Sequence, residues 1–459
     1  MNLLINKIML LVPSPGPLVR DLELPLPLDS YYLKILLVLL FLVHILFVNL
    51  MVGGSILTLF FEIVGLTHRK YDGLAKKIAE TITVNKSLAV VLGVGPLLCI
   101  NLAYTTHFYS ANALTGYAWI SIVPLVTLAF LLAYLHKYTW DRWQGAAKRW
   151  HLATGFASVF LFLCVPLIFL ANINLMLFPE KWSEVGGFFA SLQIGNVFPR
   201  YFHFLAASLA VTGLFLAGYF GRKKFAVEKA LPEFTRPELR RLFYRVAFWV
   251  SMAQLAFGPL LLFTLPSRGL TVELFLIIGA GILFVAAVLL ILRSEIRADG
   301  ARIGRRYFWI WGLLTVVVLA MGTGRHLYRE ASLAEHKALI ADENDRFNAI
   351  MLAAHMRLDA GEGLGEALGG GLTGEKVFIN CAACHAVNKV LAAPSLVEIY
   401  GLYKDNPSGI ITWAKNPGKK RPEFAPMPSF AHLGDESLGL VAEYMLEQGG
   451  KAASGSAGN

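Results

Sequence analysis

The chain alternates over most of its length between long apolar stretches and short polar segments. The apolar stretches lie at 32–66, 87–105, 117–136, 152–178, 201–221, 242–266, 271–292 and 307–327. A helix needs about 20 residues to cross a bilayer, and no stretch shows the two-residue alternation of a barrel strand, so the pattern predicts eight transmembrane helices. A helix over the first stretch would be roughly 50 Å long against a ~30 Å hydrocarbon core, so it tilts or projects.

Positive charge is concentrated in every second connecting segment. The basic segments are 67–86, 137–151, 222–241 and 293–306. The segments between them carry only Lys181, Arg200 and Arg268. The positive-inside rule places the basic segments in the cytoplasm and both termini outside. We therefore expect a multi-pass protein of the bacterial inner membrane whose C-terminal part lies in the periplasm.

The composition agrees with a membrane location. Of 459 residues, 56% are hydrophobic and 16% are charged, against about 25% charged in soluble proteins. The net charge of +10 is explained by the basic segments, so membrane lipid is expected as a partner and nucleic acid is not. Cys99 and Cys164 lie in apolar stretches and are predicted to be inert buried thiols.

The pentapeptide Cys381-Ala-Ala-Cys384-His385 carries the clearest chemistry. This spacing is the attachment signature of one covalent haem c, with Cys381 and Cys384 as the thioether residues and His385 as an iron ligand. The trailing histidine argues against a zinc or dithiol site. Because haem c is attached outside the cytoplasmic membrane, the motif supports the predicted topology independently.

The surrounding residues resemble a class I cytochrome c. Gly374 and Phe378 precede the haem motif, Pro394 follows it, and Met427 lies further along in Ala-Pro-Met-Pro-Ser-Phe. The resemblance implies a small helical domain in which His385 is the proximal ligand and Met427 the distal one. Such His/Met ligation raises the reduction potential.

We expect an all-α protein, an eight-helix transmembrane bundle followed by a small helical cytochrome c domain. The predicted parts are an outer-face segment (1–30), the membrane domain (31–329), a helical and glycine-rich linker (330–372), the cytochrome c domain (373–450) and a disordered tail (451–459).

Four histidines on different predicted spans lie in or near the outer half of the membrane. Ionisable residues inside a membrane are costly and usually functional, and histidine is a common haem ligand. The histidines are His44, His107, His203 and His326. They are candidate iron ligands for one or two b haems. Arg200 and Arg325 are candidate partners of the haem propionates, with lipid phosphate as the alternative.

The remaining histidines carry no such pattern. His136 and His151 border basic segments and are predicted to be solvated surface residues. No partner pattern is visible for His68, His336, His355 or His432.

Several segments of the membrane domain resemble the large subunit of cytochrome bd quinol oxidases. They are His44-Ile-Leu-Phe-Val-Asn, Thr139-Trp-Asp-Arg-Trp, Asn196-Val-Phe-Pro-Arg-Tyr-Phe-His203 and Gly324-Arg325. The resemblance implies that His44 and His203 bind haem. The oxygen-reducing glutamates of that family are missing: the third span has none, and Gly322 stands where the other is expected. Ile277 replaces the family's methionine ligand, so His326 or His107 is the expected substitute.

These features predict electron transfer between the quinone pool and a periplasmic cytochrome or other redox protein, through haem b and haem c. Quinol oxidation is the favoured direction. The alternative direction is reduction of quinone by an electron donor outside the membrane. Glu273 is one candidate proton acceptor. The alternatives are a terminal oxidase of the bd type with a fused cytochrome c, or a relay or anchor subunit of a larger complex with additional membrane subunits.

Overall fold

A computed structural model describes residues 28–83, 86–359, 373–382, 384–390, 393–419 and 427–455. The chain divides into two compact units, one that ends at Ile340 and one that begins at Ala341. The predicted all-α class is confirmed, because the described residues form α-helices and short 3₁₀ turns and no strand.

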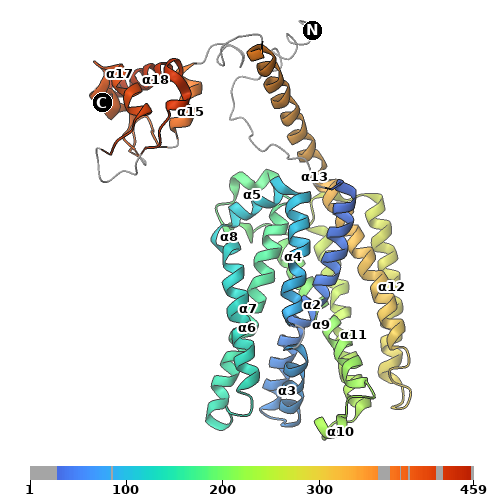
Figure 1. Ribbon diagram of the computed structural model, residues 1–459. Coiled ribbons are helices and arrows are strands. Elements are labelled where there is room, and N and C mark those ends of the chain that lie inside the picture. Colours follow the sequence, from blue (N-terminus) through green and yellow to red (C-terminus); the bar gives the residue numbers. More distant parts are fainter. Residues whose placement is uncertain are drawn as a thin grey trace. The chain divides into compact units, whose positions relative to one another are not determined.

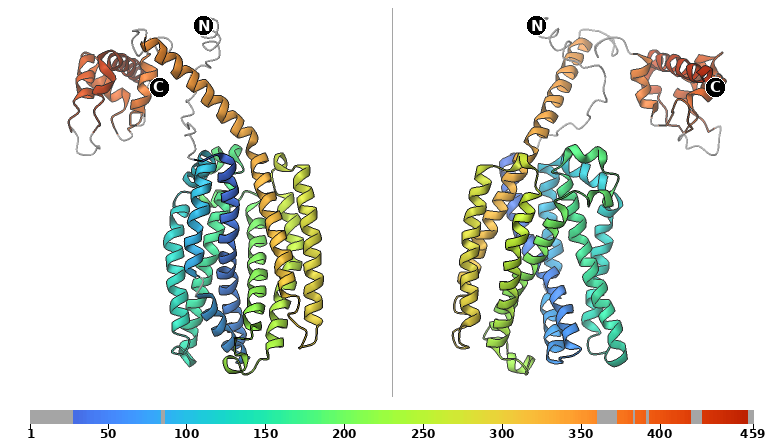
Figure 2. Two further views of the ribbon diagram at one scale, coloured as in Figure 1. Left: turned by 45° about the vertical axis from the view of Figure 1, so that its right-hand side comes forward. Right: turned by 180° about the vertical axis from the view of Figure 1, so that it is seen from behind.

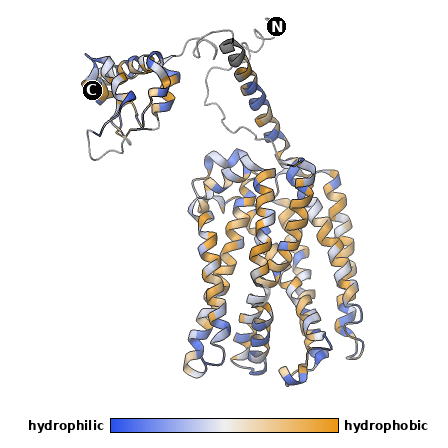
Figure 3. Cartoon of the chain, in the orientation of Figure 1, coloured by the Kyte–Doolittle hydropathy of each residue, from blue (hydrophilic) through white to orange (hydrophobic). Residues whose placement is uncertain are grey.

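The first unit is a bundle of long helices that run side by side (Figures 1 and 2). They are α2 (Ser30–Gly65), α4 (Lys86–Ala103), α6 (Tyr117–Tyr138), α7 (Lys148–Leu175), α9 (Val197–Gly221), α11 (Arg236–Phe263), α12 (Val272–Arg297) and the part of α13 (Tyr307–Asp359) up to Ile340. Among the described residues, seven helices are long and apolar enough to cross a membrane, or eight if α4 and α5 form one broken span. Helices suit lipid because they satisfy every backbone group internally. Apolar residues accordingly cover the bundle helices (Figure 3).

The second predicted span is bent rather than straight. Helix α4 ends at Ala103, and α5 (Thr105–Thr115) leaves it at an angle of 112°. The bend is at Tyr104, whose backbone is not helical (φ −141°, ψ 43°) and whose side chain is buried. His107 therefore lies on α5, beyond the straight part of the span.

The four basic segments gather at one end of the bundle, which we call the basic end. Two of them contain helices, α3 (Lys70–Thr83) and α10 (Val227–Ala230), which lie at the end opposite α5 and α8 (Phe188–Ser191) (Figure 1). Arg240 joins two segments by donating hydrogen bonds to the carbonyls of Ile303 and Gly221 at 2.6 and 2.8 Å. The alternation of charge along the sequence thus corresponds to two distinct ends in space.

Small and polar residues bring α2 and α9 close together. Thr212 donates a hydrogen bond to the carbonyl of Asn49 at 3.0 Å, and Ser208 donates to the Asn49 side chain at 2.9 Å. A Cβ on Gly53 would collide with the Ser208 carbonyl. Glycine at this position therefore permits the close approach, as small residues do between membrane helices.

The second unit packs three short helices and one longer helix, α18, around its own core. They are α15 (Gly374–Ala382), α16 (Leu396–Tyr403), α17 (Pro407–Lys415) and α18 (Gly434–Gly455). The core consists of Val377, Leu396, Ile399, Val441 and Met445. Helix α18 includes residues 451–455, which the sequence assigned to a disordered tail. The reason is local: Lys451 pairs with Glu447 one turn earlier at 2.5 Å, and Ser454 bonds the Gly450 carbonyl.

Candidate haem sites

The attachment motif begins in the last turn of α15. Cys381 packs half-buried against the core of the second unit, and Cys384 is exposed two residues beyond the helix. The backbone N–H groups of Cys384 and His385 both donate to the Cys381 carbonyl, at 3.1 and 3.0 Å. This turn holds both thiols and the imidazole in one short segment. Burial raises the pKa of the Cys381 thiol.

The His385 ring is oriented by a backbone carbonyl. Its Nδ1 donates a hydrogen bond to the oxygen of Pro394 at 2.8 Å. A carbonyl can only accept, so Nδ1 carries the proton and Nε2 keeps its lone pair. Metal-bound histidines are commonly oriented in this way. The side chain is thus prepared to bind iron through Nε2.

Met427 is half-buried in the extended segment before η4 (Ala431–Leu433). Residues 420–426 before it lie outside the described part of the chain. Phe430, three residues later, donates its N–H to the Ala414 carbonyl of α17 at 2.9 Å, which ties this segment to the helical core. The sequence and the local structure therefore fit a covalently bound haem, with Met427 remaining the predicted distal ligand.

Three of the four candidate histidines in the membrane bundle share one feature. The Nδ1 atoms of His44, His203 and His326 are buried and have no hydrogen-bond partner among the described residues. Leaving a buried polar group unpaired costs about 1–3 kcal/mol. These three rings are therefore not fixed through Nδ1 by a described protein group, and imidazole is a common axial ligand of haem iron, usually through the other ring nitrogen, Nε2. The donor set therefore fits a b-type haem.

The helices that carry these histidines are in contact. The guanidinium of Arg325 on α13 lies 4.6 Å from the centroid of the Phe41 ring on α2. A Cβ on Gly322 would stand 3.2 Å from Leu42. His326 and His44 therefore belong to the same region of the bundle.

His107 has a different environment. It is buried, and its Nε2 lies 3.0 Å from Nδ1 of His336 on α13, with both rings against Trp182. The sequence showed no partner for His336, and the structure corrects that view. Neither ring nitrogen of His107 is among the buried described atoms that lack a hydrogen-bond partner, so the haem role of His107 stays a prediction without support from the geometry.

Two partly buried arginines fit the propionate prediction. Within the described part of the chain, neither Arg200 nor Arg325 forms an ion pair with a carboxylate, and the Arg200 Nε donates a hydrogen bond to the Asn196 side-chain oxygen at 2.9 Å. Arg329 lies nearby over the Tyr104 ring at 5.0 Å. Several cations without an acid partner in an apolar interior favour an anionic ligand. Haem propionates have the required charge and planar geometry.

A carboxylate that the sequence did not single out lies next to His326. Glu330 is one helical turn further along α13 and is half-buried. It accepts hydrogen bonds from Tyr104 and from Lys34, the latter at 2.7 Å, and lies 3.2 Å from Lys337. Glu273, the candidate proton acceptor named from sequence, is exposed at the start of α12. Glu330 could have been identified from the sequence, because it follows His326 by four residues and so lies on the same face of a helix.

The expectation for His136 and His151 is wrong. Both side chains are buried, with 7% and 0% of their area exposed, because each contacts Glu62 of α2. The sequence did contain an indication of this contact, because Glu62 is an acidic residue within the apolar stretch 32–66.

A family model described as cytochrome c matches residues 372–449. No curated protein and no solved structure matches the chain. The C-terminal unit is thus a cytochrome c domain with a covalently bound haem, and the chain takes part in haem-based electron transfer. The resemblance of the membrane bundle to the oxidase subunit stays a prediction.

Proposed function

We propose that this chain transfers electrons from quinol in the bacterial inner membrane to a periplasmic redox partner. The membrane bundle would bind one or two b haems, and the cytochrome c domain binds haem c. Haem supplies reversible one-electron chemistry when it is bound. The basic end would face the cytoplasm and the α5 end the periplasm.

The observation that carries the proposal is the set of three buried histidine nitrogens, on α2, α9 and α13, that have no hydrogen-bond partner within the described ranges. Arg200 and Arg325 add unpaired positive charge on two of the same helices. A cytochrome c domain by itself needs none of these residues. A membrane bundle that binds haem needs all three features: nitrogen ligands, cations for the propionates and an apolar interior.

Glu330 and Tyr104 give the bundle a site for proton release. Quinol oxidation requires a group that accepts the hydroxyl protons, and carboxylates commonly serve as general bases. Glu330 is close to His326 along α13 and is held in position by Tyr104 and Lys34. We therefore propose that quinol binds near this carboxylate and that Glu330 accepts a proton from it.

The test begins with the haem content of the purified full-length chain. We expect haem b together with haem c, no haem d, and rapid reduction of haem c by added quinol. Quinol-dependent oxygen consumption would indicate an oxidase of the bd type instead. Haem b without any reaction with quinol would indicate a relay subunit, and the absence of haem b would refute the proposal.

A further inference from the structure

Five titratable side chains from four helices meet at the basic end of the bundle. They are Glu62 (α2), Asp72 (α3), His136 (α6), and Lys148 and His151 (α7). The Glu62 side chain is completely buried. A buried carboxylate is stable only when other groups neutralise it and bond its oxygens. The five residues form what we call the Glu62 cluster.

Both carboxylate oxygens of Glu62 are in contact with these partners. Oε2 lies 2.7 Å from Nε2 of His136. Oε1 lies 2.5 Å from Nδ1 of His151 and 2.8 Å from Nζ of Lys148. Each oxygen therefore has at least one close nitrogen, and the state of these nitrogens decides how many protons the cluster holds.

The His151 ring determines the proton count. Its Nε2 lies 2.8 Å from the carbonyl oxygen of His136, and since a carbonyl only accepts, Nε2 must carry a hydrogen. In a neutral ring Nδ1 would then present a lone pair to Glu62 Oε1, and two lone pairs at 2.5 Å repel each other. A proton between the two atoms resolves the conflict, whether it is formally on the imidazole or on the carboxyl group.

The charges of the cluster favour a proton over a metal ion at this position. Glu62 and Asp72 contribute two negative charges and Lys148 one positive charge, so a single additional proton makes the group neutral. A divalent ion would place a second cation on the oxygen that Lys148 already contacts. Uncompensated charge in a buried site is strongly unfavourable.

The cluster is connected to solvent through Lys148 and Asp72. Lys148 also lies 2.8 Å from Asp72, which accepts a hydrogen bond from the Trp140 indole at 3.2 Å. Side-chain exposure rises from 0% at Glu62 to 13% at Lys148 and 25% at Asp72. The neighbouring pair of Lys76 and Asp141 is more exposed and lies outside the cluster.

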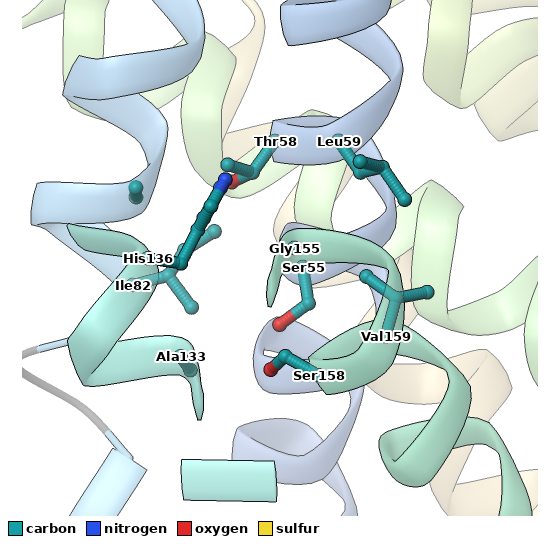
Figure 4. A pocket seen from close by; sticks show the side chains of 10 residues that line it. Ser55, Thr58, Leu59, Ile82, Ala133, His136, Gly155, Ser158 and Val159 are labelled. Atoms are coloured by element: carbon teal, nitrogen blue, oxygen red, sulfur yellow. The ribbon is translucent and has the colours of Figure 1, made fainter. Parts of the chain in front are cut away.

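A small cavity with both polar and apolar lining residues adjoins His136 (Figure 4). Its volume is about 30 Å³, and its lining includes Ser55, Thr58 and Ser158. All three hydroxyls donate to backbone carbonyls, so they present lone pairs to the cavity. The cavity is large enough for one water, which would donate to these oxygens.

Gly155 makes room for the His136 ring beside this cavity. A Cβ at position 155 would stand 2.8 Å from His136 Nε2. His136 therefore lies between the cavity and Glu62 only because position 155 has no side chain.

We propose that Glu62 and His151 share one exchangeable proton, and that the Glu62 cluster is where the membrane bundle exchanges protons with the water at its basic end. Asp72 and Lys148 lead from water to the shared proton, and His136 leads from it to the cavity. When an electron enters the apolar bundle, the cluster takes up a second proton, on the imidazole of His136, and this proton compensates the charge of the electron. This second role rests on the proposed presence of haem b, whereas the shared proton does not.

The shared proton is tested by infrared spectroscopy of the purified, haem-loaded, full-length protein in H₂O and D₂O. We expect a signal of the shared carboxyl proton that shifts in D₂O, is lost in Glu62→Gln and is altered in His151→Gln. Asp141→Asn, which changes an exposed carboxylate of the same region, should leave it unchanged. Identical spectra for the original protein and Glu62→Gln would overturn the proposal, as would a stoichiometric non-haem metal.

The coupling to electron transfer is tested by the pH dependence of the haem b reduction potential. We expect the potential to fall with rising pH, with a slope reduced at least by half in Glu62→Gln and partly in Gly155→Ala. The slope for Asp141→Asn and the potential of haem c should not change. An unchanged slope in Glu62→Gln, with the haem b spectrum intact, would refute the coupling. If the chain contained no haem b, the proposed function would be refuted. The infrared result would still show whether Glu62 and His151 share a proton.

Discussion

His44 on α2 lies with its imidazole ring against the backbone of α4 at Gly93. A Cβ at position 93 would stand 2.9 Å from Cε1 of the ring. The ring also bonds the backbone of Ala89, one turn earlier on α4. The position of this candidate haem ligand therefore depends on a glycine in a neighbouring helix, far from it in the sequence.

Replacement of Gly93 by valine should move the His44 ring. We expect Gly93→Val to weaken binding of haem b on the order of 10-fold, as changes around metal-bound histidines often do. The ratio of haem b to haem c in the purified protein measures the effect. Gly279→Val is the matched control, since a Cβ on this helical glycine meets no atom within 4 Å. Equal haem ratios in the two variants would mean that His44 has no role in haem binding.

Loss of the Arg325 charge should affect a bound haem b and leave haem c unchanged. A hydrogen bond to a charged group contributes about 1.5–3 kcal/mol, so Arg325→Gln should reduce haem b affinity. It should also lower the haem b potential, because the arginine charge favours the reduced iron. Redox titration measures both effects. Arg297→Gln, which removes an exposed charge at the opposite end of the bundle, serves as control. An unchanged haem b potential in Arg325→Gln would contradict the propionate role.

Glu330→Gln should slow quinol oxidation without removing haem. The amide keeps the size of the side chain but cannot accept the proton, and loss of a general base typically costs about 10²–10⁴-fold. Quinol-dependent reduction of haem c, followed by stopped-flow absorbance, measures the rate. Glu335→Gln changes an exposed glutamate on the same helix and should have no effect. Quinol oxidation at the normal rate in Glu330→Gln would place the proton acceptor elsewhere.

A methyl group on Gly374 should destabilise the cytochrome c domain. The new Cβ would collide with the Leu440 carbonyl where α15 crosses α18, and such overpacking typically costs about 1–3 kcal/mol. Denaturant unfolding of the full chain, followed by haem c absorbance, gives the free energy. Gly439→Ala is the control, because its Cβ meets nothing within 4 Å. It should stabilise α18 by about 0.5–1 kcal/mol. Equal stability of the two variants would contradict the close crossing.

Much of the haem c site was predictable because its chemistry is local. The two thiols and the imidazole lie within five consecutive residues, and covalent attachment requires this spacing. The orienting carbonyl of Pro394 is only nine residues from His385. The sequence did not reveal that this carbonyl is the acceptor, because every residue has a backbone carbonyl whatever its side chain.

The membrane domain was predictable in its two distinct ends and in its spans, since the described residues contain seven membrane-length helices, or eight when the bent pair α4 and α5 counts as one span. Apolar length and the placement of basic residues determine both, because each helix must satisfy its own backbone in lipid. The bend at Tyr104 was not predictable, since α4 and α5 are together apolar enough to resemble one straight span.

The sequence by itself determined the helical class, the alternation of basic segments and the covalent haem. Only the tertiary structure decided which polar residues are partners. Glu62 and His151 are 89 residues apart, His107 and His336 are 229 apart, and Tyr104 and Glu330 are 226 apart. The hydropathy of the sequence indicates the free-energy cost of burying each of these polar side chains in an apolar interior. It does not record which distant group offsets that cost, because that depends on how the helices pack.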